Sequence, residues 1–366
     1  MGDVTELKSA SRVHKGEWTD SGVPFFRSSD VMAAINGTTN EKAYISEELY
    51  EKLSNASGKL EEGDVLVTGG GSVGNPYIVP NNEPLYTKDA DLLWIKNQGR
   101  FYPYFLYEYF FSPTFRIYLS SISHVGTIAH YTITQLSETP ISLPDIEEQI
   151  KVGEYFESLD RLITLHQRKC EETKKLKKYM LQKMFPQNGK RVPEIRFAGF
   201  TDDWEQRKLE NIVEVCSGRD YKHLEAGNIP VYGTGGYMLS VSEALSYDVD
   251  AIGIGRKGTI DKPYILKAPF WTVDTLFYCI CKEGHNLNFV YDIFQNINWK
   301  AMDESTGVPS LSKTTINKVK TLIPSYLEQE KIGKYFSCLD KLITLHQRKY
   351  EELQKIKKFM LQNMFI

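Results

Sequence analysis

Two glycine-rich stretches have the residue spacing most suggestive of ligand chemistry. The hexapeptide GIGRKG at 253–258 matches the G-x-G-x-x-G pattern of dinucleotide-binding loops, but such a loop requires a helix after it. The residues that follow, 259–265, read as a strand and contain Pro263. The stretch 69–74 lacks the Lys-Ser/Thr pair of an ATP-binding loop. Both stretches are therefore interpreted as tight β-turns or as backbone that approaches DNA, and the sequence leaves these two readings open.

No other stretch supplies a catalytic set. Asn75-Pro76-Tyr77 matches part of an amino-methyltransferase motif but lacks its second proline. Asp145 after Pro144 would suit a nuclease, but a repeated copy of this segment has Ser there and no (Asp/Glu)-x-Lys follows in either copy. The seven His residues do not cluster at metal-ligand spacing. We predict a non-catalytic chain that holds no metal and no cofactor of its own.

Basic and polar residues at predicted turns are the candidates for contact with nucleic acid. Arg and Lys side chains suit guanine edges and phosphates. The alternative for each is a solvated loop residue without a ligand. The candidates are Arg27, Ser28, Ser72, Arg219, Tyr221, Lys222, Arg256, Lys257 and Thr259.

A long amphipathic segment is repeated within the chain and must organise these candidates. Residues 144–185 return at 324–365, shifted by 180 residues without a gap, and 27 of 42 positions are identical. Each copy opens with Pro and acidic residues and closes in Lys, which suits the helix dipole. We predict two helices, at 144–185 and 323–366, each roughly 60 Å long.

A heptad pattern runs along both copies. Residues seven apart are Val152, Leu159, His166, Thr173 and Met180 in the first copy, and Ile332, Leu339, His346, Leu353 and Met360 in the second. We assign Tyr155, Leu162 and Leu176 to the companion core position, with Phe156, Ile163, Cys170 and Met184 beside them. This seam predicts an antiparallel coiled coil in which the two His set the register. The alternative is two amphipathic helices packed on separate domains.

The helices separate two globular blocks of mixed α and β structure. The first block, 1–143, has strand signals at 23–26, 64–67, 77–79 and 92–95, and a helical stretch at 104–119 that Pro113 interrupts. A linker follows the first helix at 186–208, and the second block spans 209–322. We expect Phe197 and Trp204 of the linker to pack under the end of the first helix.

The two blocks are diverged copies of one unit. The peptide VPFF at 23–26 corresponds to IPVY at 229–232, and PYI at 76–78 corresponds to PYI at 263–265. Thr87 likewise corresponds to Thr272. The true repeat is therefore block plus helix, used twice. Since the helices stayed alike while the blocks drifted, we infer that the helices meet one partner twice and the blocks meet different ones.

Composition limits the compartment and the kind of partner. The 366 residues carry a net charge of −3 with a pI near 6.2, so any basic face must be local. The five Cys include no CxxC pair, which favours a reducing compartment. No signal segment and no membrane-spanning run is recognisable. We expect a cytoplasmic protein that does not bind membranes.

The order of these features resembles a known family. Both helices open with P-x-x-x-E-Q, at 144–149 and, more weakly, at 324–329, and both carry L-D-x-L-I, at 159–163 and 339–343. The peptide WEQRKL at 204–209 is similar to the usual start of a target-recognition domain. With two variable blocks, each followed by a near-identical helix, the chain resembles the specificity subunit of type I restriction–modification systems over nearly its whole length.

The resemblance implies a fold, a function and partners. The blocks would be two α/β target-recognition domains related by a pseudo-twofold axis, each reading one half of a split site in double-stranded DNA. The helices would set the spacing between half-sites and dock two methyltransferase (modification) subunits and, through them, the restriction subunits. S-adenosylmethionine and ATP with Mg would be bound by those partners, which would perform methylation and cleavage.

The sequence departs from this pattern before the first block. Met1 to Val4 align with Leu209 to Ile212, so nothing in the sequence corresponds there to the lead-in residues 197–208. We expect the first block either to be less fully closed or to share the linker with the second. Two other classes stay open: a non-catalytic two-domain coiled-coil interaction protein that does not bind DNA, and a stand-alone DNA-modifying enzyme, which the missing catalytic motifs disfavour.

Overall fold

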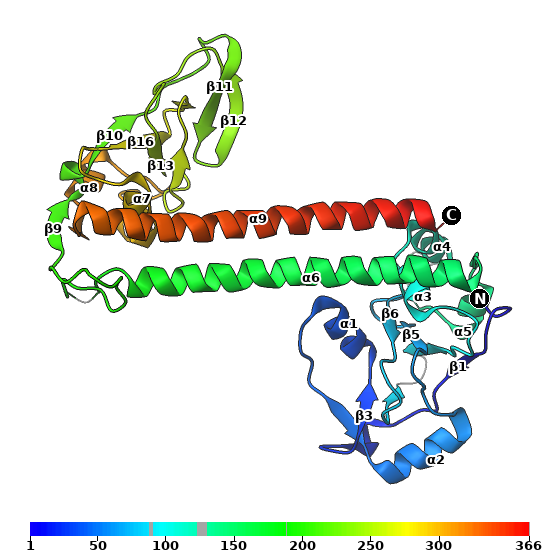
Figure 1. Ribbon diagram of the computed structural model, residues 1–366. Coiled ribbons are helices and arrows are strands. Elements are labelled where there is room, and N and C mark those ends of the chain that lie inside the picture. Colours follow the sequence, from blue (N-terminus) through cyan, green and yellow to red (C-terminus); the bar gives the residue numbers. More distant parts are fainter. Residues whose placement is uncertain (88–90, 123–129, 188, 366) are drawn as a thin grey trace. The chain divides into compact units, whose positions relative to one another are not determined.

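A computed structural model describes residues 1–87, 91–122, 130–187 and 189–365 (Figure 1). The chain folds into two compact units. Unit 1 comprises Met1–His166 with Arg348–Ile366, and unit 2 comprises Gln167–Gln347. Each unit therefore contains one block together with part of each long helix, α6 (Ile146–Lys183) and α9 (Tyr326–Met364).

Unit 1 contains two four-stranded sheets, five short α-helices and one 3-10 turn within its described residues. The sheets have the strand orders β1-β8-β5-β6 and β2-β4-β3-β7. The strands are β1 (Leu7–Ser9), β2 (Trp18–Thr19), β3 (Val23–Phe26), β4 (Ala43–Ile45), β5 (Val65–Thr68), β6 (Pro76–Ile78), β7 (Tyr86–Thr87) and β8 (Leu92–Ile95). The helices are η1 (Lys15–Glu17), α1 (Ser28–Asn36), α2 (Glu47–Ser57), α3 (Pro103–Tyr109), α4 (Pro113–Ile122) and α5 (Ile133–Glu138), of which η1 is a 3-10 turn. Pro113 thus begins a new helix, as the sequence predicts.

Unit 2 repeats the first of these sheets and part of the second. Its described strands form the orders β10-β16-β13-β14, β12-β11-β15 and β17-β9. The strands are β9 (Glu205–Lys208), β10 (Val213–Ser217), β11 (Ala226–Gly233), β12 (Gly236–Val241), β13 (Ala251–Gly255), β14 (Tyr264–Leu266), β15 (Trp271–Thr272), β16 (Leu276–Cys281) and β17 (Lys320–Ile323). The helices are η2 (Leu209–Asn211), α7 (Leu287–Asn296), η3 (Trp299–Met302) and α8 (Lys313–Lys318).

Strand register confirms the predicted correspondence between the blocks. Phe26 pairs in parallel with Thr87 in unit 1, and Tyr232 pairs in parallel with Thr272 in unit 2. Tyr77 of β6 lies opposite Leu66, and Tyr264 of β14 lies opposite Gly253. Because both sheets preserve these partners, residue 69, just after β5, takes the same backbone place as residue 256, just after β13.

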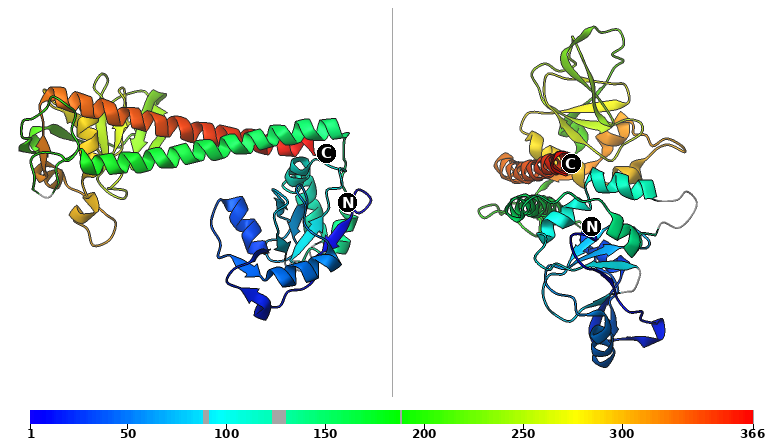
Figure 2. Two further views of the ribbon diagram at one scale, coloured as in Figure 1. Left: turned by 60° about the horizontal axis from the view of Figure 1, so that its bottom comes forward. Right: turned by 90° about the vertical axis from the view of Figure 1, so that its right-hand side faces the viewer.

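The two long helices pair antiparallel in each unit (Figures 1 and 2). In unit 2, Lys177 contacts Asp340 at 2.6 Å, and Cys170 lies 3.5 Å from Gln347, so α9 numbers fall as α6 numbers rise. In unit 1, Lys357 contacts Asp160 at 2.5 Å. The two ion pairs are equivalent by the repeat, with the roles of α6 and α9 exchanged. Residue 160 corresponds to residue 340, and residue 177 corresponds to residue 357. The predicted antiparallel coiled coil is confirmed.

One part of the predicted seam is wrong. Tyr155, Leu162 and Leu176 are exposed to 40%, 37% and 45%, so they are not core positions. The series that alternates with Val152 and its heptad equivalents is instead Phe156, Ile163, Cys170, Lys177 and Met184. Positions three and four residues away are both neighbours on a helix, and the Lys in this series disguised its regular spacing.

A Gln and a Gly near the start of each long helix bring that helix close to its block. The Gln of the P-x-x-x-E-Q motif accepts a hydrogen bond from the backbone N–H of Tyr102 in unit 1 and of Asn286 in unit 2, both at 3.1 Å. Gly153 and Gly333 lie one helical turn further on. A Cβ atom on Gly153 would lie 2.4 Å from the Tyr102 ring, and one on Gly333 would lie 2.8 Å from the Phe289 nitrogen. Only glycine therefore permits this close approach.

Phe and Trp side chains complete the core at the helix ends. In unit 2, Phe185 lies against Trp204 and Phe289, with ring centroids 5.8 and 5.5 Å away. In unit 1, Phe365 lies against Phe105 and Phe156, at 5.1 and 5.9 Å. The predicted packing of Trp204 and Phe197 under the end of α6 is confirmed, because both contact the cluster that contains Met184 and Phe185.

Candidate nucleic-acid interface

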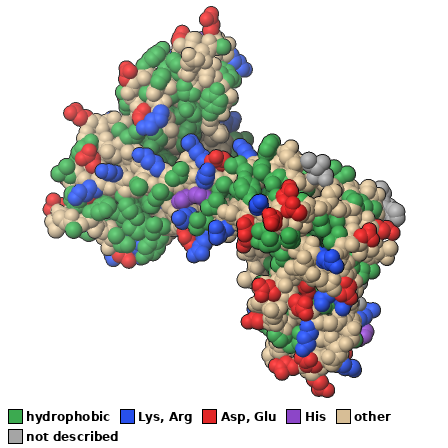
Figure 3. Space-filling view, turned by 45° about the vertical axis from the view of Figure 1, so that its right-hand side comes forward, with side chains coloured by type: hydrophobic (Ala, Val, Ile, Leu, Met, Phe, Trp, Pro, Cys, Tyr) green, Lys and Arg blue, Asp and Glu red, His purple; other side chains and the backbone are tan. Residues whose placement is uncertain are grey.

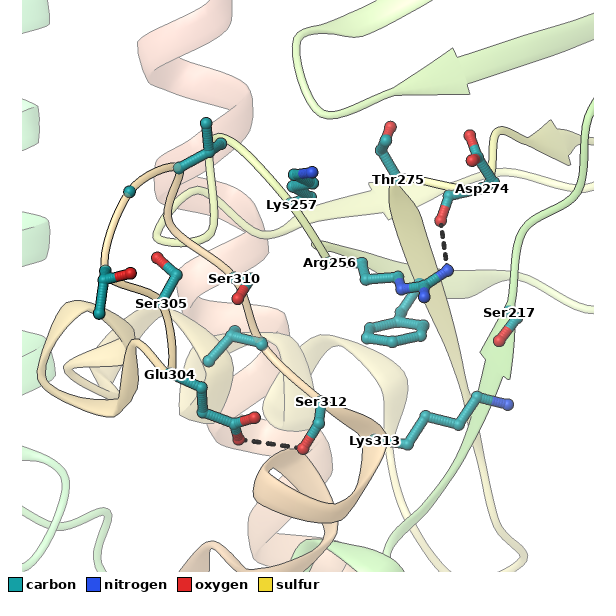
Figure 4. A pocket seen from close by; sticks show the side chains of 15 residues that line it. Ser217, Arg256, Lys257, Asp274, Thr275, Glu304, Ser305, Ser310, Ser312 and Lys313 are labelled. Carbon is teal, nitrogen blue, oxygen red and sulfur yellow. Dashed lines mark hydrogen bonds between the residues drawn. The ribbon is translucent and has the colours of Figure 1, made fainter.

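An open cleft of about 1010 Å³ lies in unit 2 beside the end of β13 (Figure 4). Arg256 begins its wall, and the backbone there is held on both sides. The N–H of Arg256 donates to the Thr275 carbonyl at 2.8 Å, and the Arg256 carbonyl accepts from the N–H of Leu311 at 2.9 Å. Gly258 N–H donates to the Pro309 carbonyl at 2.8 Å. Three loops distant in sequence therefore meet at Arg256.

The Arg256 side chain is held at one edge while the residue stays exposed. Its guanidinium lies 5.9 Å from the ring centroid of Phe277, a cation–π contact, and Nη1 donates to the Asp274 carbonyl at 3.3 Å. In the part of the chain that the structure describes, the guanidinium forms no ion pair. This arrangement fixes the plane of the group and leaves donors for a ligand.

The opposite wall of the cleft is an ordered loop, 303–312. Asp303 Oδ1 accepts from the N–H groups of Ser305 and Ser310 at 3.0 and 2.9 Å, and these bonds hold the pKa of Asp303 below its usual value. Glu304 accepts from the hydroxyl of Ser312 at 3.0 Å, and also from Thr315. The loop is therefore fixed at its base and at the start of α8.

Two further cations face the same hollow. Figure 4 shows Lys257 and Lys313 on the walls of the cleft around Arg256. Both are exposed, and neither has an ion-pair partner among the described residues. Seryl and threonyl hydroxyls contribute much of the remaining wall. The chemistry available is that of a surface with fixed donors, hydroxyls and cations, which suits polar base edges and phosphates.

The other predicted residues of unit 2 lie outside this cleft lining. Thr259 is half-buried just past Gly258. Arg219 is exposed, but its backbone is held by Thr272 at 2.8 Å and by the indole of Trp271 at 2.9 Å. Tyr221 packs on the cluster that contains Trp271, and Lys222 is exposed. These positions stay predictions.

Two of the three predicted residues of unit 1 are held by partners within the block. Arg27 is bound within the block, since its Nε donates to Asp30 at 3.0 Å and its guanidinium lies 5.6 Å from the Trp18 ring. Ser28 donates to the Asp91 carbonyl at 3.0 Å. Ser72 is exposed in the turn after β5. Sequence reasoning missed Lys313 and Asp274 altogether, because nothing in the sequence relates their loops to Arg256.

Buried charge clusters join block and helices in each unit. In unit 1, Lys357 donates to Glu108 at 2.8 Å and to Asp160. Burial raises the pKa of Glu108 to about 8, although the charge of Lys357 opposes that rise. In unit 2, burial likewise raises the pKa of Asp292, while Lys177 opposes it. Each cluster joins a carboxyl group of one block to charged groups of the two long helices, so we interpret both clusters as structural.

Both units expose the same apolar helix positions. Unit 1 exposes Leu162, Leu165 and Phe359, and the repeat equivalents Leu342, Leu345 and Tyr179 are exposed in unit 2. On the face drawn in Figure 3, apolar side chains are interspersed with basic and acidic ones. An isolated pair of helices gains nothing from such residues in water, so this repeated surface suits a partner.

None of the helices among the described residues is long and apolar enough to cross a membrane. No group of three or more His, Cys, Asp or Glu side chains lies close enough to hold a metal ion, within the ranges that the structure describes.

This chain is similar in sequence to a known family and to several of its members. The family described as type I restriction modification DNA specificity domain matches residues 1–175 and 201–355. A putative type I restriction enzyme specificity subunit from Haemophilus influenzae is 28% identical over 171 residues, which cover 45% of this chain and 41% of that protein. The MjaVIII specificity subunit from Methanocaldococcus jannaschii is 21% identical over 84% of this chain and 80% of that protein.

A solved structure has the same fold. The crystal structure of the S subunit of a type I restriction–modification system from M. genitalium superposes with a TM-score of 0.68 at 17% identity, over 100% of this chain and 94% of that one. The two family matches fall on the two block-and-helix repeats found in the sequence. The chain belongs to the family of type I restriction modification DNA specificity domains.

Proposed function

We propose that this protein is the sequence-specific DNA-recognition subunit of a type I restriction–modification complex. Each block reads one half of a bipartite site in double-stranded DNA. The observation that carries the proposal is the contrast between matched helix surfaces and unmatched block surfaces. Unit 2 presents Arg256 and Lys257 where the equivalent backbone of unit 1 carries Gly69 and Gly70, so the blocks present different chemistry to DNA.

The chain itself is proposed to be non-catalytic. Two methyltransferase (modification) subunits dock on the helices, and restriction subunits join through them. S-adenosylmethionine and ATP with Mg belong to those partners. The repeated exposed positions support two copies of one partner, since Leu165 and Leu345 offer the same contact once in each unit.

The docking proposal is tested by charge substitution on the helix surface. Leu165→Glu should remove one modification subunit, Leu345→Glu the other, and the double variant both. Mass measurement of the reconstituted complex gives the stoichiometry directly. Gln354→Glu, at an exposed position on the opposite side of α9, adds the same single negative charge and is the matched control. Full stoichiometry in the double variant would contradict docking at these residues.

The spacing role is tested by lengthening both helices together. Thr173 lies between Cys170 and Lys177, which face Gln347 and Asp340, so it faces Thr344. Inserting one heptad at 173 and another at 344 keeps the seam and lengthens the pair by roughly 10 Å. The gap between half-sites should grow by about three base pairs, at 3.4 Å each, with both half-sites unchanged. Sequencing of methylated sites made with the partner subunits measures this, and an unchanged gap would refute it.

The competing reading is a two-block interaction protein that does not bind DNA. A gel shift on random and genomic DNA, with and without the modification subunits, separates the two readings. Salt-dependent retention of DNA is expected for the recognition subunit, because phosphate contacts release counterions. Absence of any shift, with the modification subunits bound, would favour the interaction protein.

A further inference from the structure

In the cleft of unit 2, the exposed side chain of Arg256 is oriented by two contacts within the block. Arg256 rests on the Phe277 ring at 5.9 Å and donates through Nη1 to the Asp274 carbonyl at 3.3 Å. Phe277 is buried, with 3% of its surface exposed, so the ring is a rigid support. A guanidinium that is immobilised before binding loses little entropy when it forms a two-bond contact.

The surroundings of Arg256 distinguish a base contact from a phosphate contact. Asp274 and Glu304 bring carboxylates to the same cleft, and their charge disfavours a phosphate chain through its centre. Lys257 and Lys313, in contrast, are exposed on its walls without ion-pair partners among the described residues. This division fits a base edge at Arg256 with flanking phosphates at the lysines.

We propose, on the basis of the proposed function, that Arg256 determines specificity at one position of the half-site read by the second block, by donating two hydrogen bonds to O6 and N7 of a guanine in the major groove. An Arg guanidinium pairs with this edge in bidentate fashion, and no other base presents the same two acceptors there. Lys257 and Lys313 contact backbone phosphates and contribute affinity without sequence preference.

The first block supplies an internal control. Gly69 occupies the backbone place of Arg256, and its N–H donates to the Asp91 carbonyl at 2.8 Å, as the N–H of Arg256 donates to Thr275. Gly69 has no side chain with which to reach a base. The half-site read by the first block is therefore independent of Arg256, and any change there reports damage to the whole protein.

The test is the pattern of methylated sequences made by the full chain with its modification subunits on a random DNA library. Wild type should require guanine at one position of one half-site. Arg256→Ala and Arg256→Lys should relax that position by about five- to 150-fold and leave the other half-site unchanged. Arg256→Gln should shift the preference there toward adenine, whose N6 and N7 suit an amide.

Lysine variants complete the test. Lys257→Ala and Lys313→Ala should lower methylation of all sequences alike and reduce the slope of affinity against salt by about one each. Lys318→Ala, on the same helix α8 as Lys313 but outside the cleft, is the matched control and should change neither. Thermal melting of each variant checks folding.

Three outcomes would overturn the inference. Uniform loss across sequences in Arg256→Ala would mean that this residue contacts phosphate, and an unchanged pattern would mean that it contacts nothing specific. A wild-type second half-site without any required guanine would also refute it. Failure of the wild-type complex to methylate any bipartite site would refute the proposed function and, with it, this inference. Methylation of a bipartite site whose pattern is unchanged in Arg256→Ala would refute the inference alone.

Discussion

In unit 2, strand β17 pairs with β9 of the linker, Trp204 fills the core beside Phe185, and Arg196 contacts Glu328 at 2.8 Å. In unit 1, the equivalent residues 140–143 pair with no strand in the described part of the chain, and a cleft of about 550 Å³ lies beside them. Glu148, the equivalent of Glu328, is exposed and forms no ion pair within the described ranges. The linker therefore closes one edge of unit 2, and no described segment does the same in unit 1.

Other contacts are alike in both units. The Met1 ammonium donates to the Thr139 carbonyl at 2.7 Å, and the Leu209 N–H donates to the Val319 carbonyl at 2.9 Å, which are repeat-equivalent acceptors. The contact between block and helices is therefore fixed by the repeat, whereas closure of the sheet edge depends on a segment outside it. The expectation that the first block is less fully closed agrees with this geometry.

Removing the linker tryptophan should have the largest effect on stability. Trp204 is fully buried between Phe185 and Phe289, so Trp204→Ala should cost about 3–5 kcal/mol through the cavity it leaves. Hydrogen exchange followed by mass spectrometry should show lost protection in unit 2 and unchanged protection in the block of unit 1. Equal loss in both blocks would show that the linker does not stabilise unit 2 selectively.

Breaking a buried charge cluster comes next. Lys357→Met leaves Glu108 without its cation, and partial exposure of Asp160 limits the cost to about 2–3 kcal/mol. Lys177→Met should do the same in unit 2. Denaturant unfolding at pH 9, above the raised pKa of Glu108, measures both losses. At that pH Glu108→Gln should recover most of the loss in Lys357→Met, because no buried carboxylate then remains.

The same cluster predicts a pH dependence. The folded-state pKa of Glu108 is raised to about 8, above its unfolded value near 4.3, so the folded state binds more protons between these values. Its contribution to stability therefore falls as pH rises from about 4 to 8. Lys357→Met should be more destabilising at pH 9 than at pH 5. A loss independent of pH would show that Glu108 does not titrate with folding.

Adding one methyl group at each close contact should have a smaller effect. Gly333→Ala and Gly153→Ala force a shift against α7 and α3, costing about 1–3 kcal/mol, offset by about 1 kcal/mol of helix propensity. Gly333→Ala should be the worse, because it meets the backbone nitrogen of Phe289 and the Asn286 side chain that caps α7. Cys338→Ala, at an exposed position of α9, is the control and should change the free energy of unfolding little.

The smallest loss of stability is expected for two arginines that the sequence analysis both predicts to contact DNA. Arg27→Ala removes contacts with Asp30 and Trp18 and should cost about 1 kcal/mol without altering the methylated sequence. Arg256→Ala should cost less stability and alter the sequence instead. Melting curves and methylation patterns of both variants decide this, and an altered sequence in Arg27→Ala would place that residue at DNA after all.

Much of the architecture was predictable because it rests on local periodicity. The long helices follow from the heptads, and the correspondence of the blocks follows from short peptides such as PYI, which the strand registers confirm. Helices α1 and α2 were missed because they interrupt a β-rich stretch of unit 1 and have no counterpart among the described residues of unit 2. The companion seam was misassigned because Lys177 occupies one of its positions. The charge of this buried Lys is balanced by Asp340 and Asp292, which come from two other helices.

The repeat, the two helices and their antiparallel pairing could be inferred from the chain alone, because hydrophobic spacing and a gap-free internal match are visible in the sequence. Which predicted contact residues share a surface could not be inferred in this way. Arg256 meets Asp274 and Lys313 because β13, β16 and α8 bring three separate loops together, and no local pattern encodes such long-range proximity. Arg27 contacts Asp30 and Trp18 instead of lining such a cleft, because a charged side chain binds the partners that the fold places beside it.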